Sequence, residues 1–188
     1  MPLKAAIVPV TPFQQNCTLL FDEATRRGVV VDPGGDLAVI ENAIGQIGMT
    51  VEEILLTHGH LDHAGAADEL KADLGVKITG PHEADRFLLE GIEGQARAYG
   101  LLGLKNAHPD RWLVEGDTVT VAGVVFDVLH CPGHSPGSVV FVSKSERVAL
   151  VGDVLFQGSI GRTDFPYGDT EALITSVRTK LFPLGDDI

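Results

Sequence analysis

The chain has 188 residues, 44% of them hydrophobic, and this length and composition suit one globular domain with a buried core. A formal net charge of −12, with no basic stripe along the sequence, argues against nucleic acid and anionic membrane surfaces as partners. The sequence has no run long enough to span a bilayer and no apolar leader near its start, so the reducing cytoplasm is the expected location. Cys17 and Cys131 are expected as small buried side chains rather than as a disulfide or nucleophiles.

The first half of the chain predicts an antiparallel meander followed by alternating helices and strands. Pro9 and Pro12 are expected to interrupt the first strand. The stretch at 32–36 reads Asp-Pro-Gly-Gly-Asp and predicts a tight turn; whether it also lines a pocket stays open. The alternation of elements indicates α/β layering. The expected elements are strands 5–8, 16–21, 28–32, 51–56 and 76–79 and helices 37–47 and 62–74.

The second half of the chain predicts short helices, two hairpins and a final helix. Glycines punctuate residues 81–110, which are expected to form two short helices and a surface loop. Between the hairpins lies a loop at 130–138 that is rich in proline and glycine. The final helix has Asp169 or Thr170 as its expected N-cap. The hairpins pair 118–121 with 124–129 and 138–142 with 148–151, and the final helix carries Leu173, Ile174, Val177 and Leu181 on one face.

Three histidines and an aspartate crowd into six positions where the strand 51–56 ends and a helix begins. His58 and His60 lie two residues apart, so in an extended segment both project to one side. Asp62 and His63 follow the turn into the helix and can point back at the same volume. His and Asp in close order suit transition metals, and two adjacent metals, one for each pair, explain the spacing better than one. The alternative is a polar loop with solvated histidines.

Two further candidates lie at strand ends far downstream. His134 follows the strand 124–129 after a Pro-Gly step, and Asp153 follows the strand 148–151. Taken alone, the first could be an ordinary loop histidine and the second a turn or cap residue. Their position at the same kind of strand end as the first cluster favours a shared site. His82, His108 and His130 have no such neighbours and are expected to be solvated, locally bonded or supporting residues.

The order Thr57-His58-Gly59-His60-Leu61-Asp62-His63, then a distant His134 and Asp153, resembles the metallo-β-lactamase superfamily over nearly the whole chain. The resemblance implies an α/β fold, an αββα sandwich of two mixed sheets flanked by helices, as a single domain over 1–188. Within the superfamily the chain is similar to the glyoxalase II group, the hydroxyacylglutathione hydrolases, in their short bacterial form. The segments that carry this closer likeness are 15–18, 32–35, 131–138 and 161–165.

The family's roles carry over by position. His58, His60 and His134 resemble the ligands of a first metal, and Asp62 and His63 those of a second. Asp153 resembles the aspartate that bridges both metals, and the two aspartates are the implied catalytic residues. The resemblance implies two divalent cations, with zinc as the first candidate and iron or manganese as alternatives. Family members supply one more histidine after the last helix, together with a final strand. Their absence from this sequence implies either a chain cut short of its natural end or an incomplete second site.

The implied activity is hydrolysis of a thioester, S-D-lactoylglutathione, to D-lactate and glutathione by a hydroxide held between the two metals. Arg162, Phe165 and Tyr167 are the candidate substrate contacts, although Arg162 could instead form a surface ion pair with Asp164 or Asp169. The first alternative is a persulfide dioxygenase with a single iron bound by His58, His134 and Asp153. A non-catalytic binding module is a second alternative, and a lactamase is a third. Oligomeric state stays open.

Overall fold

The computed structural model describes residues 3–188, and Met1 and Pro2 lie outside this range. Its elements, in chain order, are β1 Leu3–Val10, β2 Gln15–Asp22, β3 Arg27–Val31, α1 Leu37–Ile47, β4 Thr50–Leu55, α2 Leu61–Ala64, α3 Ala67–Leu74, β5 Lys77–Thr79, η1 Glu83–Asp85, α4 Arg86–Leu89, α5 Ile92–Ala98, β6 Thr118–Val121, β7 Val124–His130, β8 Val139–Ser143, β9 Val148–Leu150, β10 Leu155–Phe156, β11 Ser159–Ile160, α6 Thr170–Ser176, η2 Val177–Leu181 and η3 Phe182–Leu184.

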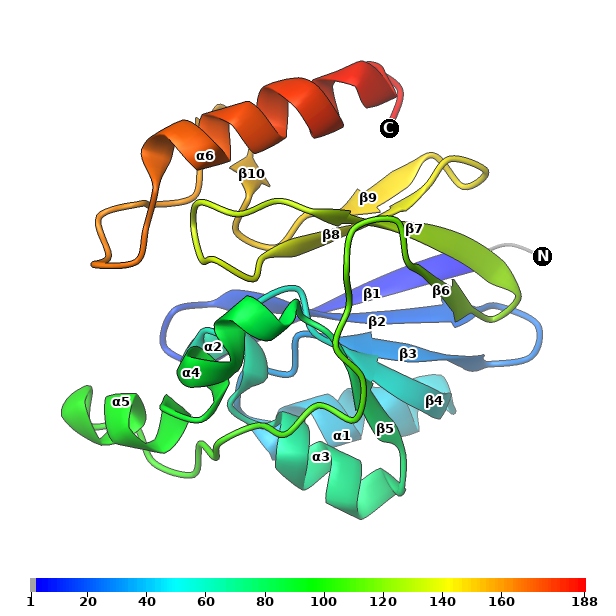
Figure 1. Ribbon diagram of the computed structural model, residues 1–188. Coiled ribbons are helices and arrows are strands. Elements are labelled where there is room, and N and C mark those ends of the chain that lie inside the picture. Colours follow the sequence, from blue (N-terminus) through cyan, green and yellow to red (C-terminus); the bar gives the residue numbers. More distant parts are fainter. Residues whose placement is uncertain (1–2) are drawn as a thin grey trace.

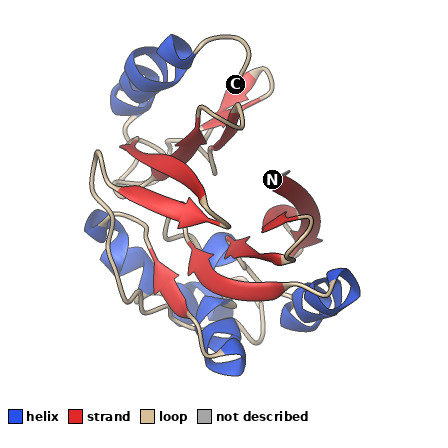
Figure 2. Cartoon of the chain, turned by 90° about the vertical axis from the view of Figure 1, so that its right-hand side faces the viewer, coloured by secondary structure: helices blue, strands red, loops and turns tan. Residues whose placement is uncertain are grey.

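Two sheets face each other and helices cover their outer sides (Figures 1 and 2). The first sheet has the order β1-β2-β3-β4-β5, antiparallel as far as β3 and parallel from β3 to β5. The second sheet is the antiparallel series β6-β7-β8-β9, and β10 and β11 form a small separate hairpin. This arrangement confirms the predicted αββα sandwich.

Three apolar clusters hold the layers together. The cluster between the sheets contains Phe126 and Phe141, both fully buried, and burying a side chain of this size contributes about 1.5–3 kcal/mol. A second cluster joins the first sheet to α1, whose Ile40 and Ile44 lie one helical turn apart and point inward. The third joins the second sheet to the last helix, where Leu173 is fully buried.

The register of the first sheet sets up the functional end of the molecule. In the parallel pairing of β3 with β4, Val31 lies opposite Leu55, and the backbone N–H of Asp32 donates to the carbonyl of Leu55. The residues that follow both strands therefore leave the sheet at the same edge, at its carboxyl end. In open α/β sheets this edge is where ligands bind.

Two sequence expectations about local structure are wrong. The helix predicted over 62–74 is divided into α2 and α3, because the backbone N–H of Ala66 donates to the carbonyl of Pro33 instead of continuing a helical turn. The first strand is not interrupted at Pro9, which stays in β1 opposite Asn16. A proline is tolerated there because β1 is an edge strand, which pairs on one side only.

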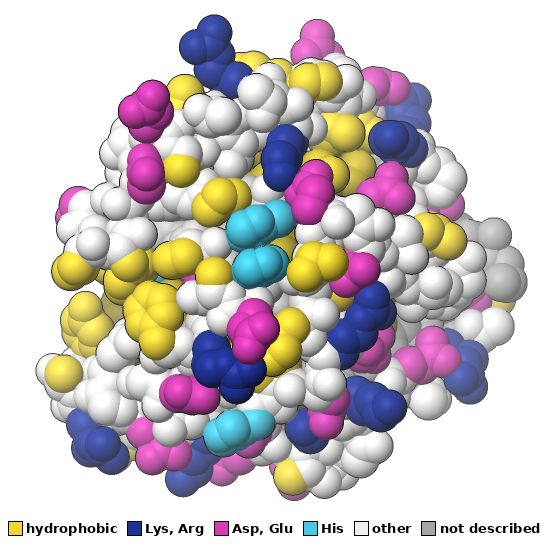
Figure 3. Space-filling model, in the orientation of Figure 1, with side chains coloured by type: hydrophobic (Ala, Val, Ile, Leu, Met, Phe, Trp, Pro, Cys, Tyr) yellow, Lys and Arg dark blue, Asp and Glu magenta, His cyan; other side chains and the backbone are white. Residues whose placement is uncertain are grey.

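The other expected strands and helices are present, with ends shifted by no more than one or two residues, and the hairpin of β10 and β11 is additional. The final helix differs from the expectation, because α6 passes into the π-helical segment η2 after Ser176 and Ile174 is exposed. Asp169 is the N-cap of α6, as expected: its side chain accepts from the N–H of Ala172. None of the helices within 3–188 combines the length and the apolar character that crossing a bilayer requires. Basic and acidic side chains are interspersed over the face in Figure 3.

Candidate metal centre

Four of the six predicted ligands lie in loops at strand ends, and the other two lie on a short helix. His58 and His60 follow β4, and Asp62 and His63 lie on the short helix α2 that begins directly afterwards. His134 lies in the loop between β7 and β8, and Asp153 follows β9. The two sheets therefore contribute to one site from opposite sides.

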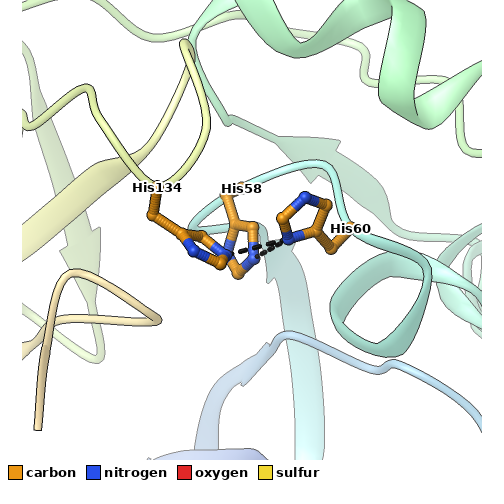
Figure 4. A group of neighbouring side chains, drawn as sticks. All are labelled: His58, His60 and His134. Atoms are coloured by element: carbon orange, nitrogen blue, oxygen red, sulfur yellow. Dashed lines mark hydrogen bonds between the residues drawn. The ribbon is translucent and has the colours of Figure 1, made fainter. Parts of the chain in front are cut away.

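The first group is a cluster of three buried imidazoles (Figure 4). The Nδ1 atom of His60 lies 3.1 Å from Nε2 of His58 and 2.9 Å from Nε2 of His134. One nitrogen from each ring lies within 4.8 Å of the others, a spacing that would let the three rings bind one metal ion. The structure thus brings together the predicted first set.

Hydrogen bonds on the far side of two rings fix which nitrogen carries the proton. The Thr57 hydroxyl donates to Oδ2 of Asp32 at 2.6 Å, so its oxygen accepts from Nδ1–H of His58 at 3.1 Å. Nδ1–H of His134 donates to the carbonyl of Arg162 at 2.8 Å. When the rings of His58 and His134 are neutral, Nε2 of each therefore carries no proton, and its lone pair is directed at the centre of the cluster.

Burial also favours the neutral form of two rings in this first group, His58 and His60. The pKa of His58 is lowered well below its ordinary value, first by burial and then by the neighbouring histidines. Burial and His134 lower the pKa of His60 to about 3. Neutral imidazole is the form that binds metals, so both rings are ready ligands at neutral pH.

The second group surrounds His63 with carboxylates. Its Nδ1–H donates to Oδ2 of Asp32 at 2.9 Å, while its Nε2 lies 3.2 Å from Oδ1 of Asp153 and 3.8 Å from Oδ2 of Asp62. Burial disfavours the charged ring, but hydrogen bonds and charge from Asp153 and Asp32 outweigh it and raise the pKa of His63 to about 10. Positive charge is therefore strongly favoured at this point of the structure.

Asp153 joins the two groups. One of its oxygens faces Nε2 of His63 at 3.2 Å, and the other faces Nε2 of His134 at 3.5 Å. Nearby imidazoles, His63 above all, overcome the effect of burial and hold the pKa of Asp153 below its usual value. A single ionised carboxylate thus lies between the two groups of donors.

A cavity of about 260 Å³ opens beside the first group and contains the predicted substrate contacts, Arg162, Phe165 and Tyr167, together with Phe13 and Tyr99. The rings of Phe165 and Tyr167 stack with centroids 5.3 Å apart. A second cavity, of about 460 Å³, lies on the other side of the cluster and also reaches Asp62 and Asp153. The two aspartates named as catalytic candidates therefore line both cavities.

Arg162 forms the surface ion pair that the sequence offered as one alternative, and it also lies at the cavity wall. Its Nε and Nη2 donate to the two carboxylate oxygens of Asp164 at 2.6 and 2.7 Å, which is the surface ion pair. Its guanidinium carbon also lies 4.5 Å from the ring centre of Phe165 at the cavity wall.

Two residues of the site have roles that sequence reasoning missed. Asp32 lies in the turn whose place in a pocket the sequence left open. It lines the cavity of about 460 Å³, is buried, and accepts from Thr57 and His63, and these two contacts were not foreseen. A usable signal was available, because Asp32 ends a strand beside the one that leads to His58. Tyr167, considered only as a substrate contact, also places its hydroxyl 2.8 Å from Nε2 of His60.

The other three histidines lie outside the cluster, as expected. His108 is exposed and its Nδ1 lies 2.8 Å from Asp68. His82 and His130 stack with ring centroids 4.2 Å apart. Nδ1 of His82 accepts from the N–H of Ala84, and Nε2–H of His130 donates to the carbonyl of Pro136.

Comparison with known proteins identifies the family. The profile of the metallo-beta-lactamase superfamily matches residues 10–188. The chain belongs to the metallo-β-lactamase superfamily. It is 49% identical over 183 residues to "Hydroxyacylglutathione hydrolase GloC" of Haemophilus influenzae, a match that covers 97% of this chain and 86% of that protein. It is 36% identical to "Probable metallo-hydrolase YqgX" of Bacillus subtilis, over 94% of this chain and 83% of that one.

Solved structures agree with this membership of the metallo-β-lactamase superfamily. The crystal structure of BLEG-1 B3 metallo-beta-lactamase superposes with a TM-score of 0.87 at 36% identity, covering 97% of this chain and 87% of that one. The structure of TTHA1623 in a di-iron-bound form superposes with a TM-score of 0.82 at 38% identity, covering 93% and 84%. Superfamily members bind divalent metals, and the cluster of His and Asp donors is of that kind.

Proposed function

We propose that the protein is a metal-dependent hydrolase of glutathione thioesters, with S-D-lactoylglutathione as its substrate. The observation that carries the proposal is the position of Asp153, whose two oxygens face an imidazole of each donor group. The printed name of the GloC relative, at 49% identity, favours hydrolysis over the dioxygenase alternative.

The donors fit divalent cations. Lone pairs of His58 and His134 converge on His60, whose Nε2–H can donate to Tyr167 and so leave a third lone pair. Three buried nitrogen lone pairs with no proton between them repel one another. A cation bound among them would replace this repulsion with attraction. In the second group, carboxylates of Asp62 and Asp153 face the same nitrogen of His63, again an arrangement that positive charge stabilises.

We assign two ions to these donors. His58, His60 and His134 would hold the first, Asp62 and His63 would hold the second, and Asp153 could serve either. Zinc is the first candidate because it accepts mixed nitrogen and oxygen ligands, and iron or manganese accept the same set. When bound, such ions supply Lewis acidity, which lowers the pKa of water toward about 7 and polarises a carbonyl.

The chain's own residues then direct the reaction. Asp62 orients the attacking water and takes up its proton, because its carboxylate lines both cavities beside the cluster. The stacked rings of Phe165 and Tyr167 hold the substrate against the three imidazoles and exclude bulk water. Attack on the thioester carbon breaks the C–S bond, and the thiolate leaves toward the open side of the cavity and is protonated by solvent.

The test compares two reactions of the metal-loaded protein. With S-D-lactoylglutathione we expect equal amounts of D-lactate and glutathione, with no oxygen uptake. With glutathione persulfide we expect no oxygen uptake. Oxygen consumption with the persulfide, without hydrolysis of the thioester, would establish the dioxygenase instead.

Releasing Arg162 from Asp164 should improve binding of an anionic substrate. The two side chains form a bidentate pair at the cavity rim, so a glutathione carboxylate must compete with Asp164 for the guanidinium. Because the pair is exposed, we expect Asp164→Asn to lower KM for S-D-lactoylglutathione by about two- to fivefold, with kcat unchanged. Steady-state kinetics against an uncharged N-acetylcysteamine thioester provide the control. An equal change in KM for both substrates would contradict this role.

A further inference from the structure

One buried carboxylate outside the donor set ties the two ligand loops together. Asp85 ends the short turn η1 and is fully buried. Its Oδ2 accepts from the N–H of Gly59 at 2.8 Å and from the hydroxyl of Ser135 at 2.7 Å, and its Oδ1 accepts from the N–H of Gly137 at 2.6 Å. Gly59 lies between His58 and His60, and the other two partners follow His134.

The local sequence is shaped around this contact. A Cβ atom on Gly137 would lie 2.6 Å from Cγ of Asp85, and one on Gly59 would lie 3.1 Å from its Cβ. A side chain at either glycine would therefore push the carboxylate away from its partners. Ser135 is held in turn by Ser138, with their hydroxyl oxygens 2.7 Å apart. The two loops come from different sheets, so Asp85 bridges the sandwich at the level of the three imidazoles.

The chemistry of the position requires acceptors only. Each of its three partners, two backbone N–H groups and one hydroxyl, donates to the carboxylate. An asparagine would turn an NH₂ group toward at least one donor and leave that donor unpaired in a buried place. Asp85 does not line the cavity beside the three imidazoles, and within 3–188 its carboxylate bonds only to these three loop partners.

We propose that Asp85 is a positioning residue that fixes His134 relative to His58 and His60, and so sets the affinity of the three-histidine site for its metal ion. The proposal rests on the proposed metal centre but not on the identity of the substrate. Residues that orient metal ligands without touching the metal are typically worth 10- to 100-fold in affinity.

The test measures metal affinity directly. Zn²⁺ is titrated against a competing fluorescent chelator, and Co²⁺ is bound to record its visible ligand-field spectrum. We expect Asp85→Asn to weaken Zn²⁺ binding about 10- to 100-fold and to alter the Co²⁺ spectrum. Ser135→Ala removes one of the three contacts while Asp85 stays in place, and it should shift both readouts in the same direction by less.

Asp22 offers a matched control at the far end of β2. It is also a buried carboxylate that accepts from two backbone N–H groups and one hydroxyl, those of Ala24 and Thr25. Asp22→Asn should lower the melting temperature without changing Zn²⁺ affinity or the Co²⁺ spectrum.

The outcomes separate the two proposals. Asp85→Asn and Ser135→Ala variants that bind Zn²⁺ as tightly as the Asp22→Asn variant would overturn the role of Asp85. If Asp85→Asn does not fold, Ser135→Ala decides alone. A wild-type protein that binds Zn²⁺ but does not hydrolyse S-D-lactoylglutathione would overturn the proposed function and leave the role of Asp85 intact.

Discussion

Asp153→Asn should lower kcat for S-D-lactoylglutathione hydrolysis by about 10³-fold, the upper end of the range for removing one group that stabilises charge in a transition state. The carboxylate lies between His63 and His134, at 3.2 and 3.5 Å, and so faces both sets of donors. The amide keeps the shape of the side chain but has one acceptor oxygen and no charge. We therefore expect the metal content per chain to fall together with the rate, which metal analysis and steady-state kinetics measure side by side.

Asp127→Asn is the control for this substitution. This substitution makes the same chemical change at a half-exposed position on the second sheet, where Asp127 pairs with Lys144. It should leave both rate and metal content as they are. An Asp153→Asn protein with full metal content and a kcat within a fewfold of wild type would contradict the bridging role.

Gly34→Ala should damage the site although it replaces none of the proposed ligands. A Cβ atom on Gly34 would lie 1.4 Å from the backbone oxygen of Asp62, so the start of α2 must move. Overpacking of this kind costs about 1–3 kcal/mol in the free energy of unfolding, and a shift of about 1 Å in a catalytic group costs about 100-fold in rate. We expect both losses, measured by urea unfolding and by steady-state kinetics.

Gly45 provides the matched control. It lies inside α1, and an added Cβ there has nothing within 4 Å. Gly45→Ala should stabilise the protein by about 0.5–1 kcal/mol, because alanine gives up less backbone freedom in a helix, and should leave activity unchanged. A Gly34→Ala protein as stable and as active as the Gly45→Ala protein would contradict the expectation that close packing of Gly34 against Asp62 is needed for function.

Local pattern was enough to predict most of the fold. Strands and helices with clear periodicity, such as α1 with Ile40 and Ile44 inward and Gly48 at its end, are where they were expected. The exceptions have tertiary causes. The helix over 62–74 divides because Ala66 bonds to Pro33, a partner in another segment, and Pro9 stays in its strand because β1 lies at a sheet edge. The hairpin of β10 and β11 has only two residues in each strand, too few for a periodic signal.

In the candidate site, too, local pattern predicted some residues, and others depend on tertiary contacts. The six proposed ligands were predicted because each lies at a strand end or helix start, and the structure brings all six into one cluster. Asp32 and Asp85 were missed because their roles depend on partners far away in the sequence. Asp32 reaches His63 across 31 positions, and Asp85 reaches Gly137 across 52. Such supporting carboxylates look like ordinary turn residues until the loops around them are assembled.

The most direct test of a shared metal centre is the rate of S-D-lactoylglutathione hydrolysis as Zn²⁺ is returned to protein stripped by a chelator. The account predicts no hydrolysis by the stripped protein and a rate that rises with added Zn²⁺ until two equivalents per chain are bound. Stripped protein that keeps its rate, or a rate that is complete at one equivalent, would contradict it.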